Sequence, residues 1–249
     1  MTTITMAEEH STQFELLTQL RQGVYEARRE LAVHGPRSIS ETVPRVTPLV
    51  RSGQERTYEF TAAPPTMDVD SLLSSRSSQR FFADRAMNPR VVAASVLEAL
   101  RADSVCWPED EPVDLLVVVN SVNGMEPGLY RAQPAKSADA VTFDFLQQIS
   151  REDIAEMVLQ LEFAHAPAII MAVSSLEAHL HRWGDHGEPL MNRRAGQAVA
   201  SALLNAQRRG AAGQIFAGCL PSGLARHLTV DGYYRAQLLA AVIGDPWTA

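Results

Sequence analysis

Two short apolar runs constrain the fold of this chain more than any other feature of its sequence. The runs "VDLLVVV" at 113–119 and "AIIMAVSS" at 168–175 are rich in β-branched residues, as buried strands are. A third apolar stretch, at 234–246, also has the character of a strand. None is long or continuous enough to cross a bilayer, which takes about 20 apolar residues. We therefore expect a sheet in the interior of a soluble protein, with no membrane partner.

Helical patterns separate these strands. The predicted helices span 12–33, 88–103, 150–167 and 191–210. Ser150 and Asp153 form a capping box at the start of the third, and Gly210 ends the fourth. Because helices and strands do not alternate as regular βαβ units, the sequence predicts an α+β fold.

The N-terminal quarter of the chain differs from the rest. After the helix at 12–33, residues 35–66 are rich in proline and show little periodicity, apart from a short strand pattern at 56–61. An acid-capped helix then begins at Asp68. We predict an N-terminal helix and extended linker over 1–66 and one compact domain over 67–249.

Composition excludes several classes of partner. The 249 residues carry a formal net charge of -7, whereas a nucleic acid or an anionic membrane would require a basic face. Cys106 and Cys219 are the two cysteines, and without a secretory leader we expect them to be thiols of a cytoplasmic protein. Lys136 is the only lysine, so any role that needs a lysine amine has one candidate.

The stretch "SSRSSQRFF" at 74–82 carries the first candidate site. Arg76, Ser78 and Arg80 alternate, so an extended backbone would point all three side chains to one side. Two guanidiniums and a hydroxyl arranged in this way can clamp a phosphate or another oxyanion. The alternative is a solvated, polar helix end.

Two further stretches have residues that suit a ligand-binding surface. Trp107-Pro108 precedes a buried strand, where the indole would lie against a ligand ring or fill a gap in the core. Gly213 and Gly218 flank a short apolar strand, where they would let a ligand approach the backbone or form ordinary turns.

Taken in order, these stretches resemble the nitroreductase-like flavoproteins, in particular their SagB/McbC-type branch. Members of that branch are FMN-dependent dehydrogenases that oxidise azolines to azoles in ribosomal peptide natural products. The resemblance covers about residues 65–246. It is carried by "RSSQRFF" (76–82), "DSVCWPED" (103–110), the Gly-Leu-Tyr-Arg strand in "MEPGLYRAQP" (125–134), and the long helix and following strand at 193–218.

The resemblance implies an FMN-binding α+β sandwich with a central, mostly antiparallel sheet flanked by helices. It also implies a homodimer with the flavin at the subunit interface. The cofactor-binding residues that it implies are Arg76, Ser77, Ser78, Arg80, Ser104, Trp107, Gln197, Ala217 and Gly218. The first four would hold the phosphate and ribityl chain, and Ser104 would lie near the isoalloxazine ring. Ala217 and Gly218 would bring backbone N–H groups close to flavin N5.

The chain departs from the family at two places. In azoline dehydrogenases of this branch a Lys-Tyr pair occupies the loop that corresponds to 174–187, whereas this chain has Arg182-Trp183 there. Oxidising an azoline requires a base, but arginine stays protonated and an indole only donates. In the long helix, Gln197 and Ala200-Ser201 stand where a His and a Gln-Asn pair are usual.

Several interpretations of the loop remain open. His179, His181 or His186 would accept the proton, since neutral imidazole suits that role, although His179 and His181 would equally suit plain exposure at the surface. Arg182 would instead stabilise negative charge on reduced flavin or substrate, or the chemistry has been lost. No metal is predicted, because no cysteine or paired carboxylate stands near the His-x-His pair. The catalytic candidates are Arg182, Trp183, His181 and His186.

The sequence therefore predicts an FMN-dependent oxidoreductase. Its expected substrate is a heterocycle or amino-acid-derived unit in peptide natural product biosynthesis, as in the oxidation of an azoline to an azole. The first alternative is a catalytically reduced scaffold that serves as the partner subunit of a modifying complex, with the helix at 12–33 as a docking element. The second alternative is an NAD(P)H-dependent nitroreductase.

Overall fold

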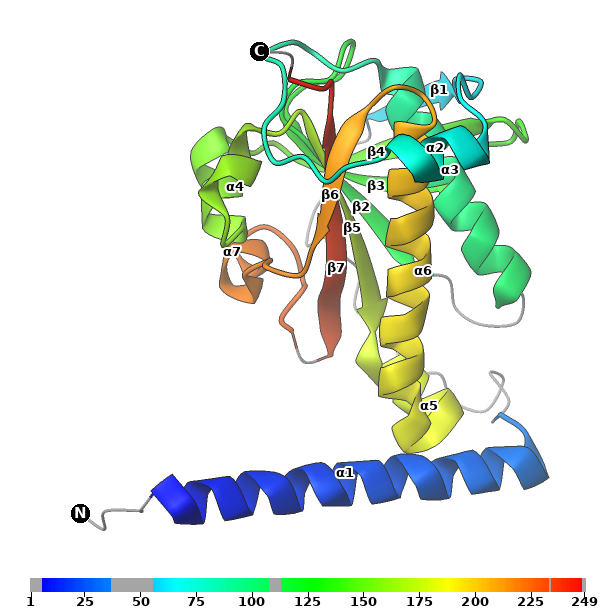
Figure 1. Ribbon diagram of the computed structural model, residues 1–249, viewed down its shortest axis with the longest axis vertical. Coiled ribbons are helices and arrows are strands. Elements are labelled where there is room, and N and C mark those ends of the chain that lie inside the picture. The colour runs from blue at the N-terminus through cyan, green and yellow to red at the C-terminus, as the bar shows by residue number, and fades with distance from the viewer. Residues whose placement is uncertain (1–5, 37–55, 108–112, 233, 248–249) are drawn as a thin grey trace. The chain divides into compact units, whose positions relative to one another are not determined.

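The computed structural model describes residues 6–36, 56–107, 113–232 and 234–247 (Figure 1). The chain divides into two compact units. The smaller consists of Met1–Val46 and Leu176–Met191, and the larger of Thr47–Ser175 and Asn192–Ala249. The division of the chain at residue 66 stays a prediction.

An antiparallel sheet forms the centre of the larger unit. Within the described residues its seven strands follow the order β1-β4-β3-β2-β5-β7-β6. Their bounds are β1 Thr57–Thr61, β2 Asp114–Val119, β3 Gly128–Pro134, β4 Ala140–Gln147, β5 Ala168–Ser175, β6 Ala212–Phe216 and β7 Arg235–Gly244. Every neighbouring pair is antiparallel, which confirms the predicted sheet. The two apolar runs of the sequence are β2 and β5, and they lie side by side in its middle.

Helices cover both faces of this sheet (Figure 1). Their bounds are α2 Val69–Ser75, α3 Pro89–Cys106, α4 Arg151–Met157, the 3-10 helix η1 Leu161–His165, α6 Gly187–Gln207 and α7 Pro221–Ala225. One core cluster joins α3 and α6 to the sheet, and a second joins α4, η1 and α7 to it. Alternate residues of β2 serve the two clusters: Leu115 and Val117 point to the first, and Leu116 to the second. Because both faces of the sheet are covered at β2, the sequence of this strand is apolar throughout instead of alternating between apolar and polar residues.

Helix caps follow the sequence pattern closely. Asp68 accepts a hydrogen bond from the Ser71 backbone N–H at the start of α2, and Asn88 caps α3. The Ser150–Asp153 capping box is present at α4. The helix predicted over 150–167 nevertheless ends at Met157, because Val158 becomes extended and forms an antiparallel bridge with Cys219.

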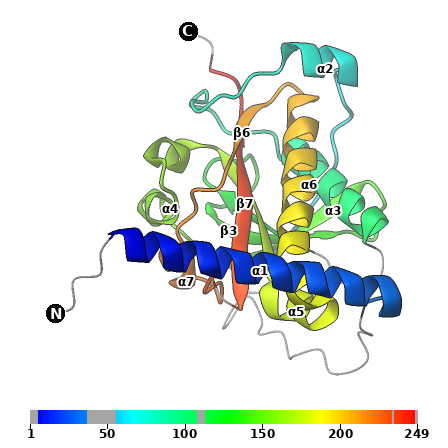
Figure 2. The ribbon, with the colours of Figure 1, turned by 60° about the horizontal axis from the view of Figure 1, so that its bottom comes forward.

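The smaller unit contains α1 Met6–His34, α5 Leu176–Trp183, the 3-10 helix η2 Gly184–His186 and the first turn of α6. Figure 2 shows α1 as one unbroken helix, longer than the predicted span of 12–33. The expectation of a polar loop at 174–187 is wrong, because α5 and η2 occupy most of this segment. Gly187 packs so closely on α5 that a Cβ there would lie 2.4 Å from the His179 carbonyl oxygen. This packing is set by tertiary contact, which a local pattern does not reveal.

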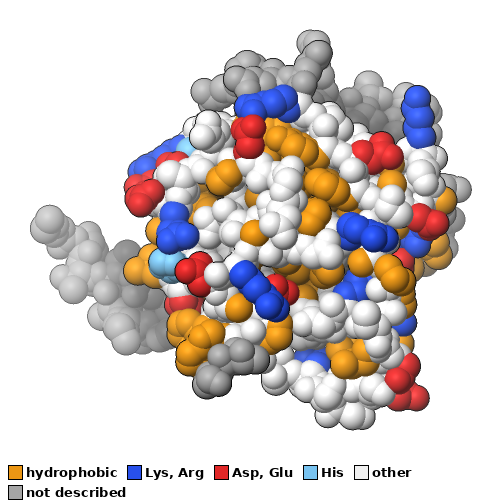
Figure 3. Space-filling model, turned by 90° about the horizontal axis from the view of Figure 1, so that it is seen from above, with side chains coloured by type: hydrophobic (Ala, Val, Ile, Leu, Met, Phe, Trp, Pro, Cys, Tyr) orange, Lys and Arg blue, Asp and Glu red, His pale blue; other side chains and the backbone are white. Residues whose placement is uncertain are grey.

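Two surface properties bear on partners. Basic and acidic side chains are interspersed, with apolar side chains between them, on the face seen in Figure 3. In the described part of the chain, no helix combines the length and the apolarity that crossing a bilayer requires. A cytoplasmic location stays a prediction.

Candidate functional site

A cleft in the larger unit forms where the segment after α2 runs beside β6. Ser78 makes a parallel bridge with Gly213, and the Gln79 N–H donates to the Gly213 carbonyl oxygen at 3.2 Å. The cleft has a volume of about 800 Å³. Its lining residues are Arg76, Ser78, Gln79, Arg80, Phe81, Leu203, Gln214, Ile215 and Trp247. A basic, hydroxyl-bearing segment therefore faces the apolar residues of a strand and a helix.

The alternating residues Arg76, Ser78 and Arg80 all line this cleft. An Arg80 guanidinium nitrogen lies 3.5 Å from a Glu162 carboxylate oxygen, at the long limit of a hydrogen bond. Arg76 has no hydrogen bond or ion pair from its guanidinium to the described residues. A guanidinium in a cleft without an acidic partner is a ready donor to an oxyanion.

Ser77 does not line this cleft. It lines a separate cavity of about 170 Å³ together with Gln207. The Gln207 side chain donates to the Ser77 carbonyl oxygen at 3.4 Å. Arg76 lines this cavity as well as the cleft, whereas Ser78 and Arg80 line the cleft only.

Ala217 and Gly218 follow the last residue of β6 and do not line the cleft. The Leu159 N–H donates to the Gly218 carbonyl oxygen at 2.7 Å. A Cβ at Gly218 would lie 2.6 Å from Gln160 Oε1. That oxygen is buried and has no hydrogen-bond partner among the described residues. Gln160 is an acceptor that the sequence analysis did not identify.

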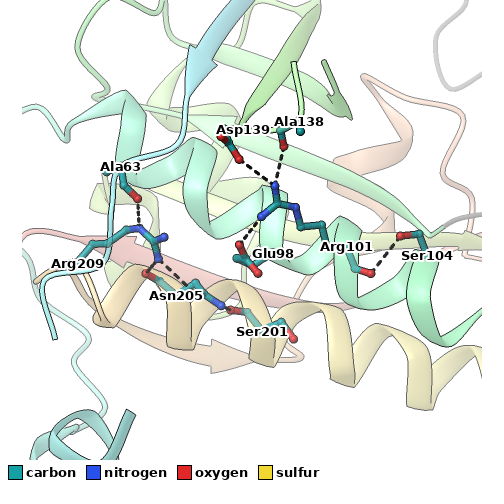
Figure 4. A network of polar contacts seen from close by, with 9 residues as sticks. All are labelled: Ala63, Glu98, Arg101, Ser104, Ala138, Asp139, Ser201, Asn205 and Arg209. Carbon is teal, nitrogen blue, oxygen red and sulfur yellow. Dashed lines mark hydrogen bonds and ion pairs between the residues drawn. The ribbon is translucent and has the colours of Figure 1, made fainter. Parts of the chain in front are cut away.

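Ser104, Trp107 and Gln197 form a different group at the end of α3, outside the cleft lining. Ser104 is exposed and donates to the Arg101 carbonyl oxygen (Figure 4). The Gln197 amide donates to Cys106 Sγ at 3.0 Å. None of the three residues lines the cleft with Arg76 and its neighbours.

A buried ion pair lies beside this group. Arg194 donates to both carboxylate oxygens of Asp103, at 3.0 and 2.8 Å, and the two side chains are 0% and 5% exposed. Asp103 also accepts from the Val113 N–H at 3.1 Å. The guanidiniums of Arg193 and Arg194 lie 5.1 and 5.5 Å from the centre of the Trp107 ring. The pair joins α3 to α6 and to the entry of β2, and it fixes the surroundings of Trp107.

Two other arginines hold the periphery of the sheet (Figure 4). Arg209 donates to the Ala63 carbonyl oxygen at 2.6 Å, and burial lowers the pKa of its guanidinium, which stays protonated. Arg101 donates to the Ala138 carbonyl oxygen and pairs with Glu98. These contacts are structural, since none reaches the cleft lining.

The remaining predicted residues belong to the smaller unit. The Arg182 guanidinium lies 5.4 Å from the centre of the Trp183 ring, and both side chains are half-buried on α5. His181 and His186 are also half-buried. His179 is 4% exposed, so the interpretation of His179 as a surface residue is wrong. Across the described ranges, no three His, Cys, Asp or Glu side chains are grouped to hold a metal ion.

The fold and the cleft together define a class, the α+β proteins with the nitroreductase fold. A family model described as the Nitroreductase family matches residues 73–245, and this chain belongs to that family. Members of the family are FMN oxidoreductases. Among curated proteins, none matches the sequence.

Solved structures share the fold at low sequence identity. One is described as a nitroreductase from Anabaena variabilis, with a TM-score of 0.62 and 15% identity over 85% of this chain; the match covers 50% of that chain. A second, described as a nitroreductase from Ralstonia eutropha, has a TM-score of 0.60 and 16% identity, covering 86% of this chain and 99% of that one. A third is the E. coli microcin synthetase McbBCD complex with truncated pro-MccB17 bound, with a TM-score of 0.53 and 13% identity. The match covers 93% of this chain and 98% of that chain. At these identities the likeness is one of fold.

Proposed function

We propose that this protein is an FMN-dependent oxidoreductase that holds the cofactor in the cleft beside β6. The observation that supports the proposal is that Arg76, Ser78 and Arg80 all line that cleft. A phosphate is bound well by paired guanidiniums and a hydroxyl. Family membership supports FMN as the phosphate-bearing ligand.

The residues present fit such a cofactor. A cleft of about 800 Å³ lies within the range of roughly 300–1,000 Å³ usual for small-molecule sites. Leu203 and Ile215 offer apolar contact, and Trp247 offers an aromatic face. Gln160 Oε1, buried beside Gly218, would accept a hydrogen bond from a ring N–H. Of the predicted binding residues, Arg76, Ser78 and Arg80 line this cleft. A part in FMN binding for Ser77, Ser104, Trp107, Gln197, Ala217 and Gly218, which lie outside the lining, stays a prediction.

Bound FMN would supply the two-electron acceptor for a substrate hydride. The chain's own residues would orient the substrate and manage its proton. In this proposal His181 or His186 accepts the proton, and Arg182 with Trp183 binds negative charge and a ring. The homodimer implied by the resemblance remains part of the proposal.

We further propose a substrate of the peptide natural product class, such as an azoline-bearing peptide that is oxidised to the azole. The Gly-Leu-Tyr-Arg stretch in β3 supports this class, as does the shared fold of the microcin synthetase complex. The test is anaerobic mixing of the flavin-loaded protein with a thiazoline peptide. Loss of flavin absorbance, together with a product lighter by two hydrogen atoms, is expected. Oxidation of NADPH by a nitroaromatic acceptor, with an unchanged peptide, would favour the generic nitroreductase instead.

A scaffold role is a second candidate, favoured by the apolar surface of α1. Phe14, Leu16, Leu17 and Leu20 are all more than half exposed, and clustered exposed apolar side chains mark interaction surfaces. Purified protein that is colourless and takes up no added FMN would support the scaffold. A yellow protein that turns over substrate would exclude it.

A further inference from the structure

The smaller unit contains a pocket of its own, whose lining includes Arg182 and Trp183, the two residues that the proposed function assigns to the substrate. The last turn of α1 and the turn after α5 enclose about 170 Å³. Glu30 and His34 line it from α1, and Arg182 and Trp183 line it from the other side, over the aliphatic side chain of Leu31. One carboxylate, one imidazole, one guanidinium and one indole therefore share a single small space.

Two glycines permit the close approach of elements that builds this pocket. Gly184 has φ +59°, a left-handed conformation that costs other residues free energy, and it turns the chain directly after Trp183. A Cβ at Gly23 on α1 would lie 2.5 Å from Asp185 Oδ2 in η2. A side chain at Gly23 would have to displace the Asp185 carboxylate, so α1 and η2 are in close contact here.

Groups of both charges line the pocket. Glu30 and His34 are one helical turn apart, and neither forms a hydrogen bond or an ion pair with the described residues. The Arg182 guanidinium lies 5.4 Å from the Trp183 ring centre. Glu30 of α1 and Arg182 of α5 therefore give the pocket one acidic and one basic group, with the Trp183 ring beside the latter.

The volume limits what can enter. A water molecule occupies about 30 Å³ of liquid, so a pocket of about 170 Å³ accommodates roughly six non-hydrogen atoms. A flavin or a length of peptide is too large. A molecule that carries both a carboxylate and an ammonium within that size is a small amino acid.

We propose that this pocket binds a free small amino acid as its zwitterion. Arg182 receives the carboxylate, with His34 as a second donor, and Glu30 receives the ammonium. The Trp183 ring contacts the remaining atoms and adds a cation–π contribution to the ammonium. A peptide terminus presents only one of the two charges, so the site selects the free amino acid.

The test is calorimetric titration of the full chain with glycine, which measures binding without turnover. Saturable binding is expected. Acetate and methylammonium, each with one of the two charges, are expected to bind at least about tenfold more weakly, as the loss of a charge-assisted hydrogen bond predicts. The result does not depend on FMN, so a failed flavin assay leaves it intact.

Single-residue variants test whether Glu30 and Arg182 bind the glycine. Glu30→Gln and Arg182→Met are each expected to weaken glycine binding by about tenfold or more. Glu26→Gln is the matched control: Glu26 lies on the same helix, accepts from Gln22 at 3.0 Å and is absent from the pocket lining. Circular dichroism of each variant checks that α1 remains helical. No saturation by glycine at tens of millimolar, or equal affinity in Glu30→Gln and the unaltered protein, would overturn the proposal.

Discussion

Replacing Asp103 with leucine is expected to be among the most destabilising single changes in the larger unit. Its carboxylate binds Arg194 through two hydrogen bonds, at 3.0 and 2.8 Å, and neither side chain is more than 5% exposed. Removing one member of such a pair leaves a buried charge uncompensated, which costs about 3–5 kcal/mol. The Val113 N–H loses its acceptor as well. The expected loss lies at the upper end of that range.

Urea unfolding followed by circular dichroism measures this loss as a change in the free energy of unfolding. The double variant Asp103→Leu/Arg194→Met removes both charges and is expected to be more stable than Asp103→Leu alone. Glu98→Gln is the control, since its pair with Arg101 is 36% and 44% exposed, and exposed pairs contribute at most about 1 kcal/mol. A loss below about 1 kcal/mol for Asp103→Leu, no larger than that of the control, would refute the reasoning.

Three further predictions concern packing, thiol reactivity and pH. Gly213→Ala should lower the urea midpoint, because a Cβ at this position would lie 2.4 Å from a backbone carbonyl oxygen. Gly196→Ala should instead raise the free energy of unfolding by about 0.5–1 kcal/mol, because the space around a Cβ at this helical position is open. Burial raises the pKa of Cys219 to about 12, so mass spectrometry after iodoacetamide treatment at neutral pH should show modification of the exposed Cys106 and not of Cys219. A hydrogen bond from the Ser150 backbone N–H lowers the pKa of Asp153, so the ionised carboxylate stabilises the fold above the ordinary carboxyl pKa, and this stabilisation disappears as the pH falls through the lowered pKa. The difference in stability between Asp153→Asn and the unaltered protein should therefore shrink on acidification. A difference that is independent of pH would contradict this prediction.

Local patterns were sufficient to predict most of the fold. The runs that became β2 and β5 are continuous and apolar because both faces of the sheet are covered. The capping box at α4 is a local hydrogen-bonding pattern and is present as predicted. Arg76, Ser78 and Arg80 all line the cleft, but Gln79 and Phe81 line it too, so the shared side that the alternation indicates stays a prediction.

Long-range contacts could not be predicted in this way. Asp103 and Arg194 are 91 residues apart, and each occurs in a stretch that reads as an ordinary helix. The close packing of Gly187 on α5 depends on the His179 backbone carbonyl, a contact that the residue pattern does not reveal. Trp247 joins the cleft from the far end of the chain, which only the topology of β7 explains.

The central claim, that Arg76 and Arg80 anchor the phosphate of FMN, is tested most directly by the dissociation constant of added FMN. Quenching of flavin fluorescence measures it in the unaltered protein, in Arg76→Ala and Arg80→Ala, and in Arg85→Ala, an arginine of the same segment that pairs with Asp245 outside the cleft. A lost charge-assisted contact of about 1.5–3 kcal/mol predicts a dissociation constant raised about ten- to a hundredfold in the first two variants and unchanged in the third. Equal affinity in all four proteins, or no binding by the unaltered protein, would contradict the account.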